Sequence, residues 1–302
     1  AGALPRRAPS MTYRRVCLAV SECVVTQPWP RCTGKGTASA SKQPVRALLN
    51  PANPSLAGTA LSYFPRGGPC PQPPSRGTGS SASWGGMEAG SGMLYPTQVV
   101  DGVVHRLGGA ALRQALAAAA PESGGVRCDV GAAVVTPAVG ALTEFDLIAH
   151  TPPPFWPDRA WQQAEWALQL GGCYVASAAA LRRVIATGAP LRIAAPLLGA
   201  GAAGAPVGAA ARAAAAAVPL ALSAAAQLVP VSASAGASVP PAARASAAAT
   251  ICFVLQDQGA CEAMQEAITE QRRQHSTAWQ HIHVHVHVHN TPVVGGGCDC
   301  CA

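Results

Sequence analysis

The chain has 302 residues, of which 12% are charged and 5% aromatic, and its formal net charge is +7. This length suits one hydrophobic core with irregular flanks. The basic residues are spread along the chain without an aromatic stripe, which argues against nucleic-acid binding. A diffuse positive field favours an anionic ligand such as a phosphate ester, although a merely solvated surface explains the same charges.

The eleven cysteines are scattered over a chain much longer than a small disulfide-rich secreted domain. They favour reduced thiols in an intracellular compartment, either the cytoplasm or the nucleus. The most membrane-like run is residues 193–229, but it is rich in Ala and Gly and contains prolines and an arginine. A spanning helix needs about 20 strongly apolar residues, so we predict no membrane segment.

Residues 1–15 are predicted to be a basic leader, which contains the first methionine, Met11. Its composition, rich in Arg and poor in acidic residues, is typical of an organelle transit peptide. An untranslated leader misread as protein has the same composition, and both interpretations stay open. The folded domain is predicted at residues 16–270.

Within this domain, short apolar runs alternate with Ala-rich segments. The predicted strands lie at residues 45–50, 132–136, 145–150, 191–198 and 250–256. The predicted helices lie at residues 99–120, 164–188 and 210–229. Such alternation predicts an α/β fold of three layers, with ligands at the carboxyl ends of the strands.

Two segments do not fit the alternation. Residues 65–93 form an insertion rich in Gly, Pro and Ser, and loops of that length are usually functional or disordered. Residues 271–302 form a tail rich in His and Cys, which we predict to be disordered.

The tail contains alternating histidines. They are His281, His283, His285, His287 and His289. In an extended strand they would share one face at a spacing of about 6.6 Å, where imidazoles can bind zinc or copper. A repeat-derived sequence without function explains the same pattern. We therefore predict no metal site and expect the tail to be dispensable for ligand binding.

Candidate binding residues follow two of the predicted strands. Asn50 and Asn53 come at the end of the strand at 45–50, where asparagine also serves as a common turn residue. The stretch PLLGAGAAGAP at 196–206 lies between a strand and a helix and has almost no functional side chains. Its glycines let backbone N–H groups approach a phosphate, and the following helix N-terminus favours an anion. A low-complexity Gly/Ala turn is the alternative interpretation.

Six short motifs occur in a characteristic order. They are NPAN at 50–53, VDGVVHRLGG at 100–109, CDVGAAVVTPA at 128–138, LIAHTPPPFW at 147–156, LGGCYVASAAAL at 170–181 and AGAAGAP at 200–206. In this order they resemble the macro domain family, which binds ADP-ribose, and the resemblance extends from about Val45 to Ile268. It implies a three-layer α/β/α fold with a mixed central sheet.

The resemblance also implies roles for individual residues. Asn53 would meet the distal ribose, and Asn50 is a further candidate for ligand binding. Asp101, followed by Gly102, would lie beside the first phosphate. In the hydrolytic branch of the family, Asp101 would be the catalytic residue that positions the attacking water. The loop that wraps the diphosphate would consist of Gly199, Ala200, Gly201, Ala202, Ala203 and Gly204. A first glycine loop is expected at residues 85–92.

Two functions follow from this resemblance. The chain would hydrolyse ADP-ribose from mono-ADP-ribosylated proteins or from O-acyl-ADP-ribose, or it would be a non-catalytic reader of ADP-ribose. Its partner would be ADP-ribose or an ADP-ribosylated protein, it would need no cofactor, and we expect a monomer. If Asp101 were only a helix N-cap, its loss would cost about 1 kcal/mol of stability. A metal-binding protein and an unordered low-complexity product are the other hypotheses.

Overall fold

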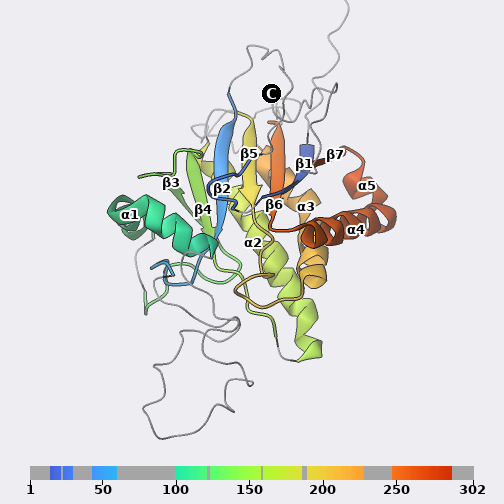
Figure 1. Ribbon diagram of the computed structural model, residues 1–302, viewed down its shortest axis with the longest axis horizontal. Coiled ribbons are helices and arrows are strands. Elements are labelled where there is room, and N and C mark those ends of the chain that lie inside the picture. Colours follow the sequence, from blue (N-terminus) through green and yellow to red (C-terminus); the bar gives the residue numbers. More distant parts are fainter. Residues whose placement is uncertain are drawn as a thin grey trace, which may run out of the picture.

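The computed structural model describes residues 14–21, 23–29, 43–59, 99–120, 123–157, 159–185, 189–227 and 247–287. Over these residues, a seven-stranded sheet lies between helices (Figure 1). The predicted three-layer α/β/α fold is confirmed.

The sheet has the strand order β3-β4-β2-β5-β6-β1-β7. The strands are β1 (Arg14–Val20), β2 (Val45–Pro51), β3 (Val134–Pro137), β4 (Leu147–Thr151), β5 (Leu191–Ala195), β6 (Ala249–Leu255) and β7 (Ile282–His287). Every neighbouring pair is parallel except β3 and β4, so the sheet is mixed, as predicted. The carboxyl ends of the six parallel strands therefore share one edge of the sheet.

Helices cover both faces of this sheet. They are α1 (Val100–Ala119), the 3-10 helix η3 (Ala160–Gln162), α2 (Gln163–Val184), α3 (Val207–Ala226), α4 (Gln258–Gln274) and α5 (Ser276–Trp279). Apolar side chains of α1 and of residues 23–29 pack on one face, and those of α2, α3 and α4 pack on the other. The two hydrophobic clusters bury the sheet from both sides, as a parallel sheet requires.

The predicted core elements are present, with shifted ends. The first strand, β1, was not predicted, and it includes Arg14 and Arg15, which the sequence pattern assigns to the leader. The strand predicted at 191–198 ends at Ala195 because Pro196 begins the glycine loop. Residues 1–13 and the insertion at 65–93 lie outside the described residues.

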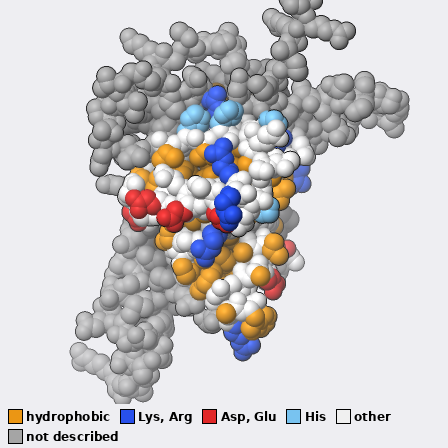
Figure 2. All heavy atoms as spheres, turned by 90° about the vertical axis from the view of Figure 1, so that its right-hand side faces the viewer, with side chains coloured by type: hydrophobic (Ala, Val, Ile, Leu, Met, Phe, Trp, Pro, Cys, Tyr) orange, Lys and Arg blue, Asp and Glu red, His pale blue; other side chains and the backbone are white. Residues whose placement is uncertain are grey.

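The prediction of a disordered tail from residue 271 is wrong as far as residue 287. Helix α4 continues to Gln274, Trp279 is 2% exposed, and β7 pairs in parallel with β1. The reason is the alternation itself, because Ile282 and Val284 pack against the core while His283, between them, lies on the other face. Figure 2 views this side of the molecule and shows histidine side chains gathered near one end of a line of Lys and Arg side chains.

Helix α3 is long and apolar enough to cross a membrane by length and composition alone. Half of its most apolar stretch is buried in this fold, where the helix packs against α2 and α4. Its many buried alanines have small side chains, which allow neighbouring helices to approach closely.

Candidate functional site

The site begins at the carboxyl end of β2, where Asn50 is fully buried. Its Nδ2 donates to Oδ1 of Asp101 at 2.9 Å and lies 3.1 Å from Nδ1 of His150. His150 is the residue opposite Asn50 in the register of β2 and β4. The sheet therefore places these two side chains together, and α1 brings Asp101 to them.

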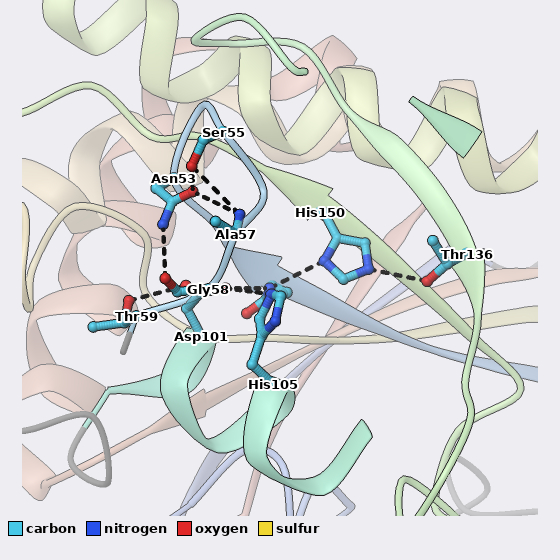
Figure 3. A network of polar contacts seen from close by, with 10 residues as sticks. Asn53, Ser55, Ala57, Gly58, Thr59, Asp101, His105, Thr136 and His150 are labelled. Atoms are coloured by element: carbon cyan, nitrogen blue, oxygen red, sulfur yellow. Dashed lines mark hydrogen bonds and ion pairs between the residues drawn. The ribbon is translucent and has the colours of Figure 1, made fainter. Parts of the chain in front are cut away.

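Asp101 lies in the first turn of α1, which Val99 precedes as the N-cap. Its side chain does not cap the helix. Instead, Oδ2 accepts a 2.9 Å hydrogen bond from the Thr59 hydroxyl (Figure 3). Oδ1 accepts a hydrogen bond from Asn50. The helix dipole favours the negative charge of Asp101, which is 3% exposed. The interpretation of Asp101 as a simple N-cap is therefore wrong, because the carboxylate joins α1 to β2 and to the loop that follows it.

His150 extends the network toward the edge strand β3. Since Asn50 Nδ2 is a donor, Nδ1 of His150 must accept, and the proton of the neutral ring lies on Nε2. Nε2 then donates to the hydroxyl of Thr136 at 3.0 Å. Burial lowers the pKa of His150 to about 3, and the nearby His105 contributes to the same shift. The ring is therefore neutral at pH 7 and holds the Asn50 amide in one orientation.

His105 packs beside this network, one helical turn after Asp101. Its Nε2 lies 3.6 Å from Oδ1 of Asp101, and burial lowers the pKa of His105 while the Asp101 charge opposes that shift. The ring is also packed against Gly58, whose φ is +84°. A Cβ at Gly58 would lie 2.4 Å from the ring, so only glycine fits there. Gly102 is buried in the same turn of α1.

Asn53 organises the loop after β2. Its Nδ2 donates to the carbonyl of Gly58 at 3.2 Å, and its Oδ1 accepts from the Ser55 hydroxyl at 2.8 Å and the Ala57 amide at 3.3 Å (Figure 3). These bonds fold the segment into the turn that places Thr59 against Asp101. The structure thus gives Asn53 a local role in addition to the predicted contact with ribose.

The glycine loop joins β5 to α3, and β5 is the neighbour of β2 in the sheet. Gly199 and Gly204 both have positive φ, at 84° and 76°. The Ala205 amide donates to the Gly199 carbonyl at 2.8 Å, and the Gly204 amide donates to the Gly201 carbonyl at 2.9 Å. The loop is therefore a closed, internally bonded turn at the predicted edge of the sheet.

Two anchors hold this loop. The hydroxyl of Tyr174 on α2 accepts from the Leu198 amide at 2.8 Å and donates to the Pro196 carbonyl at 3.3 Å. The Trp156 amide, after β4, donates to the Ala203 carbonyl at 2.9 Å. The motifs HTPPPFW and LGGCY therefore meet the glycine loop, although they are distant from it in sequence.

Some backbone amides of this loop donate hydrogen bonds within the protein, and others do not. The Ala200 amide donates to the Leu197 carbonyl at 3.4 Å, and that of Gly204 is bonded as above. Within the described part of the chain, the amides of Gly201, Ala202 and Ala203 have no hydrogen-bond partner. Gly201 is exposed, and a Cβ there would meet nothing within 4 Å. Three consecutive amides are thus left for an external acceptor.

Four residues of the network around Asp101 were not predicted as site residues: Thr59, Thr136, His105 and His150. Thr59 and Thr136 contact partners that are distant in sequence, so no local pattern indicates them. His105 lies four residues after Asp101 in the motif VDGVVHRLGG, and this helical spacing is the signal that could have identified it. The expected first glycine loop at 85–92 lies outside the described residues. Among the residues that the structure describes, no group of three or more His, Cys, Asp or Glu side chains could hold a metal ion.

The Macro domain family model matches residues 89–214, a range that holds Asp101 and the glycine loop. This match confirms the resemblance to the macro domain family over that range. Asn50 and Asn53 precede the matched range. No curated protein compared with the chain matches it.

Several solved macrodomains are similar in structure. An Oceanobacillus iheyensis macrodomain mutant with ADPR is 16% identical to this chain, with a TM-score of 0.47. The match covers 85% of this chain and 92% of the macrodomain. The macro domain of ganglioside induced differentiation associated protein 2 is 15% identical with a TM-score of 0.46, covering 87% and 90%. A Trypanosoma brucei macrodomain in complex with ADP is 16% identical with a TM-score of 0.41, covering 85% and 79%.

Proposed function

We propose that this chain binds ADP-ribose, with the diphosphate lying against the backbone amides of Gly201, Ala202 and Ala203. The observation that carries this proposal is the set of three consecutive amides without a partner among the described residues. Backbone N–H groups in such a turn form an anion-binding concavity, and the N-terminus of α3 adds a favourable dipole. The match of this segment to the Macro domain family supports the same ligand.

The ribose is proposed to lie toward the loop after β2, at the neighbouring strand. Asn53 Nδ2 has two protons, and the bond to the Gly58 carbonyl uses one of them. The other is left for a ribose hydroxyl. Asn50 has a different role, because its amide is buried and holds Asp101 and His150.

The geometry favours a reader of ADP-ribosylated proteins over a hydrolase. A general base must lie within hydrogen-bond reach of the water that it activates. The Asp101 carboxylate is buried, and each of its oxygens already accepts a hydrogen bond from Asn50 or Thr59. We therefore assign Asp101 as a positioning residue that fixes the start of α1 beside the ligand.

The test is a calorimetric titration of the full chain with ADP-ribose, followed on the same sample by a release assay. The release substrates are a mono-ADP-ribosylated protein and O-acyl-ADP-ribose. We expect saturable binding and no release. Absence of binding would overturn the proposed function. If the wild type releases ADP-ribose and Asp101→Asn does not, the protein is a hydrolase and not a reader.

A further inference from the structure

A row of polar side chains crosses the other edge of the sheet, where the parallel strands begin. The second residues of β5, β6, β1 and β7 are Arg192, Thr250, Arg15 and His283. Each is the register partner of the next. Register partners on neighbouring strands lie about 4.8 Å apart and share a face of the sheet. Two guanidiniums, a hydroxyl and an imidazole are thus aligned on four adjacent strands.

This row lies on the face of the sheet that α1 covers elsewhere. On β5, β6 and β1, the side chains two residues further along, Ala194, Cys252 and Cys17, belong to the hydrophobic cluster on that face. Over the row itself, Trp29 packs against Arg192, whose Cζ lies 4.8 Å from the centroid of the indole ring. The aromatic ring forms one wall beside the row.

Two buried donors at this wall have no acceptor. Nε1 of Trp29 and Nε of Arg192 are both buried and have no hydrogen-bond partner among the described residues. An unsatisfied buried donor costs about 1–3 kcal/mol, and two of them in one contact call for an explanation. A ligand with several acceptor oxygens satisfies both.

The basic side chains near Arg192 also favour an anionic ligand at this edge of the sheet. Burial lowers the pKa of Arg192, the thiols of Cys252 and Cys17 oppose that shift, and the positive charges of Arg46 and Arg15 lower the pKa further. The carboxylates of Glu144 and Asp146 lie 3.8 and 4.0 Å from Arg46, the neighbour of Arg192 on β2. These two carboxylates therefore pair with Arg46 on the β2 side of Arg192, and Thr250 and Arg15 lie on its other side.

We propose that Arg192, Thr250, Arg15 and the indole N–H of Trp29 form a second anion site, which binds a phosphate group or phosphate monoester. Guanidinium groups match the geometry of tetrahedral oxyanions, and the central threonine supplies a hydroxyl donor. The site lies at the amino ends of the strands, whereas the glycine loop lies at the carboxyl ends. It is thus independent of the proposed ADP-ribose site.

The test uses the full chain labelled with ¹⁵N, carrying Gly201→Glu to prevent phosphate binding at the glycine loop. Sodium phosphate is titrated at constant ionic strength, and the side-chain N–H signals are followed by NMR. We expect the Trp29 indole and Arg192 Nε–H signals to shift saturably. The Trp166 indole already donates to the Pro154 carbonyl at 3.2 Å, so its signal should stay in place.

Variants then identify the residues that bind. Thr250→Val and Arg15→Gln should each weaken phosphate binding about tenfold, the loss expected when a hydrogen bond to a charged group is removed. Arg14→Gln is the matched control, because Arg14 precedes Arg15 on β1 and faces the other side of the sheet. Trp29→Phe keeps a ring beside Arg192 and removes only the donor, so it should also weaken binding. Circular dichroism checks that each variant is folded.

Repeating the titration with glycerol phosphate distinguishes the two ligand sources. Tighter binding of inorganic phosphate identifies the free ion, and tighter binding of glycerol phosphate identifies an esterified ligand. Absence of a saturable shift overturns the proposal. It is equally overturned if sodium chloride produces the same shifts, or if Arg14→Gln weakens binding as much as Arg15→Gln.

Discussion

The amide of Asn50 donates a 2.9 Å hydrogen bond to the carboxylate of Asp101, across 51 positions of the sequence. Both residues are buried, at 0% and 3% exposure. The bond joins the end of β2 to the first turn of α1, and it leads through His150 to Thr136 on the antiparallel edge strand β3. The buried network therefore fixes the position of α1 relative to the edge of the sheet at which we propose that ADP-ribose binds.

Removing the Asn50 amide should destabilise the fold substantially. In Asn50→Ala, an oxygen of Asp101 and Nδ1 of His150 lose their buried donor, so we expect the free energy of unfolding to fall by about 3 kcal/mol. Thr59→Val is the control, since it removes the donor to the other Asp101 oxygen at a half-buried position and should cost about 1 kcal/mol. Urea unfolding measures both. Equal losses would show that the Asn50 bond is no more important than the Thr59 bond.

The buried His150 ring should make stability depend on pH. Its pKa is about 3 in the fold, compared with 6.5 for a solvent-exposed histidine, so the unfolded chain binds the proton first as the pH falls. This contribution to stability is present in full above about pH 6.5 and is lost on acidification, by up to about 1.4 kcal/mol per pH unit between about pH 6 and pH 4.

His150→Gln supplies the comparison for this pH dependence, because glutamine keeps a side-chain acceptor for Asn50 and does not titrate. Urea unfolding of both proteins at pH 7, 6, 5 and 4 gives the two slopes. The carboxylates contribute equally to the two slopes, so the difference between the slopes gives the contribution of His150. We expect a shallower slope in the variant, and identical slopes would contradict a neutral, buried His150.

Truncation tests the place of β7. A chain that ends after Glu270 lacks Trp279 and Ile282, which are 2% and 3% exposed, and we expect its free energy of unfolding to fall by at least about 4 kcal/mol. A chain that ends after His287 keeps both residues and the pairing of β7 with β1, so it is the matched control. Thermal unfolding compares the two. Equal melting temperatures would contradict the docking of this strand.

The sequence indicated the fold where the pattern is local. The apolar run ending at Asn50 and the helix containing Asp101 were predicted within a few residues, because strand and helix periodicities are visible in short windows. The glycines of the loop at 199–204 likewise indicated a turn between a strand and a helix. The order of the motifs indicated the family.

The contacts that build the site are not local. Nothing in the sequence near Thr136 or Thr59 indicates that the first binds His150 and the second binds Asp101. The alternation in β7 is compatible with an extended strand, but the sequence alone predicted disorder. The strand forms by parallel pairing with β1, whose residues lie about 268 positions away in the sequence. The alignment of Arg15 with Arg192 also exists only once the sheet is formed.

The most direct test of the proposed function is ADP-ribose calorimetry on three proteins: the wild type, Gly201→Glu and Gly201→Gln. A side chain at Gly201 meets no atom within 4 Å, so both variants should fold and differ mainly in charge. A carboxylate at this position repels the diphosphate from the loop amides, and we expect Gly201→Glu to abolish measurable binding while Gly201→Gln retains weaker binding. Wild-type affinity in Gly201→Glu would show that the amides of this loop do not hold the diphosphate.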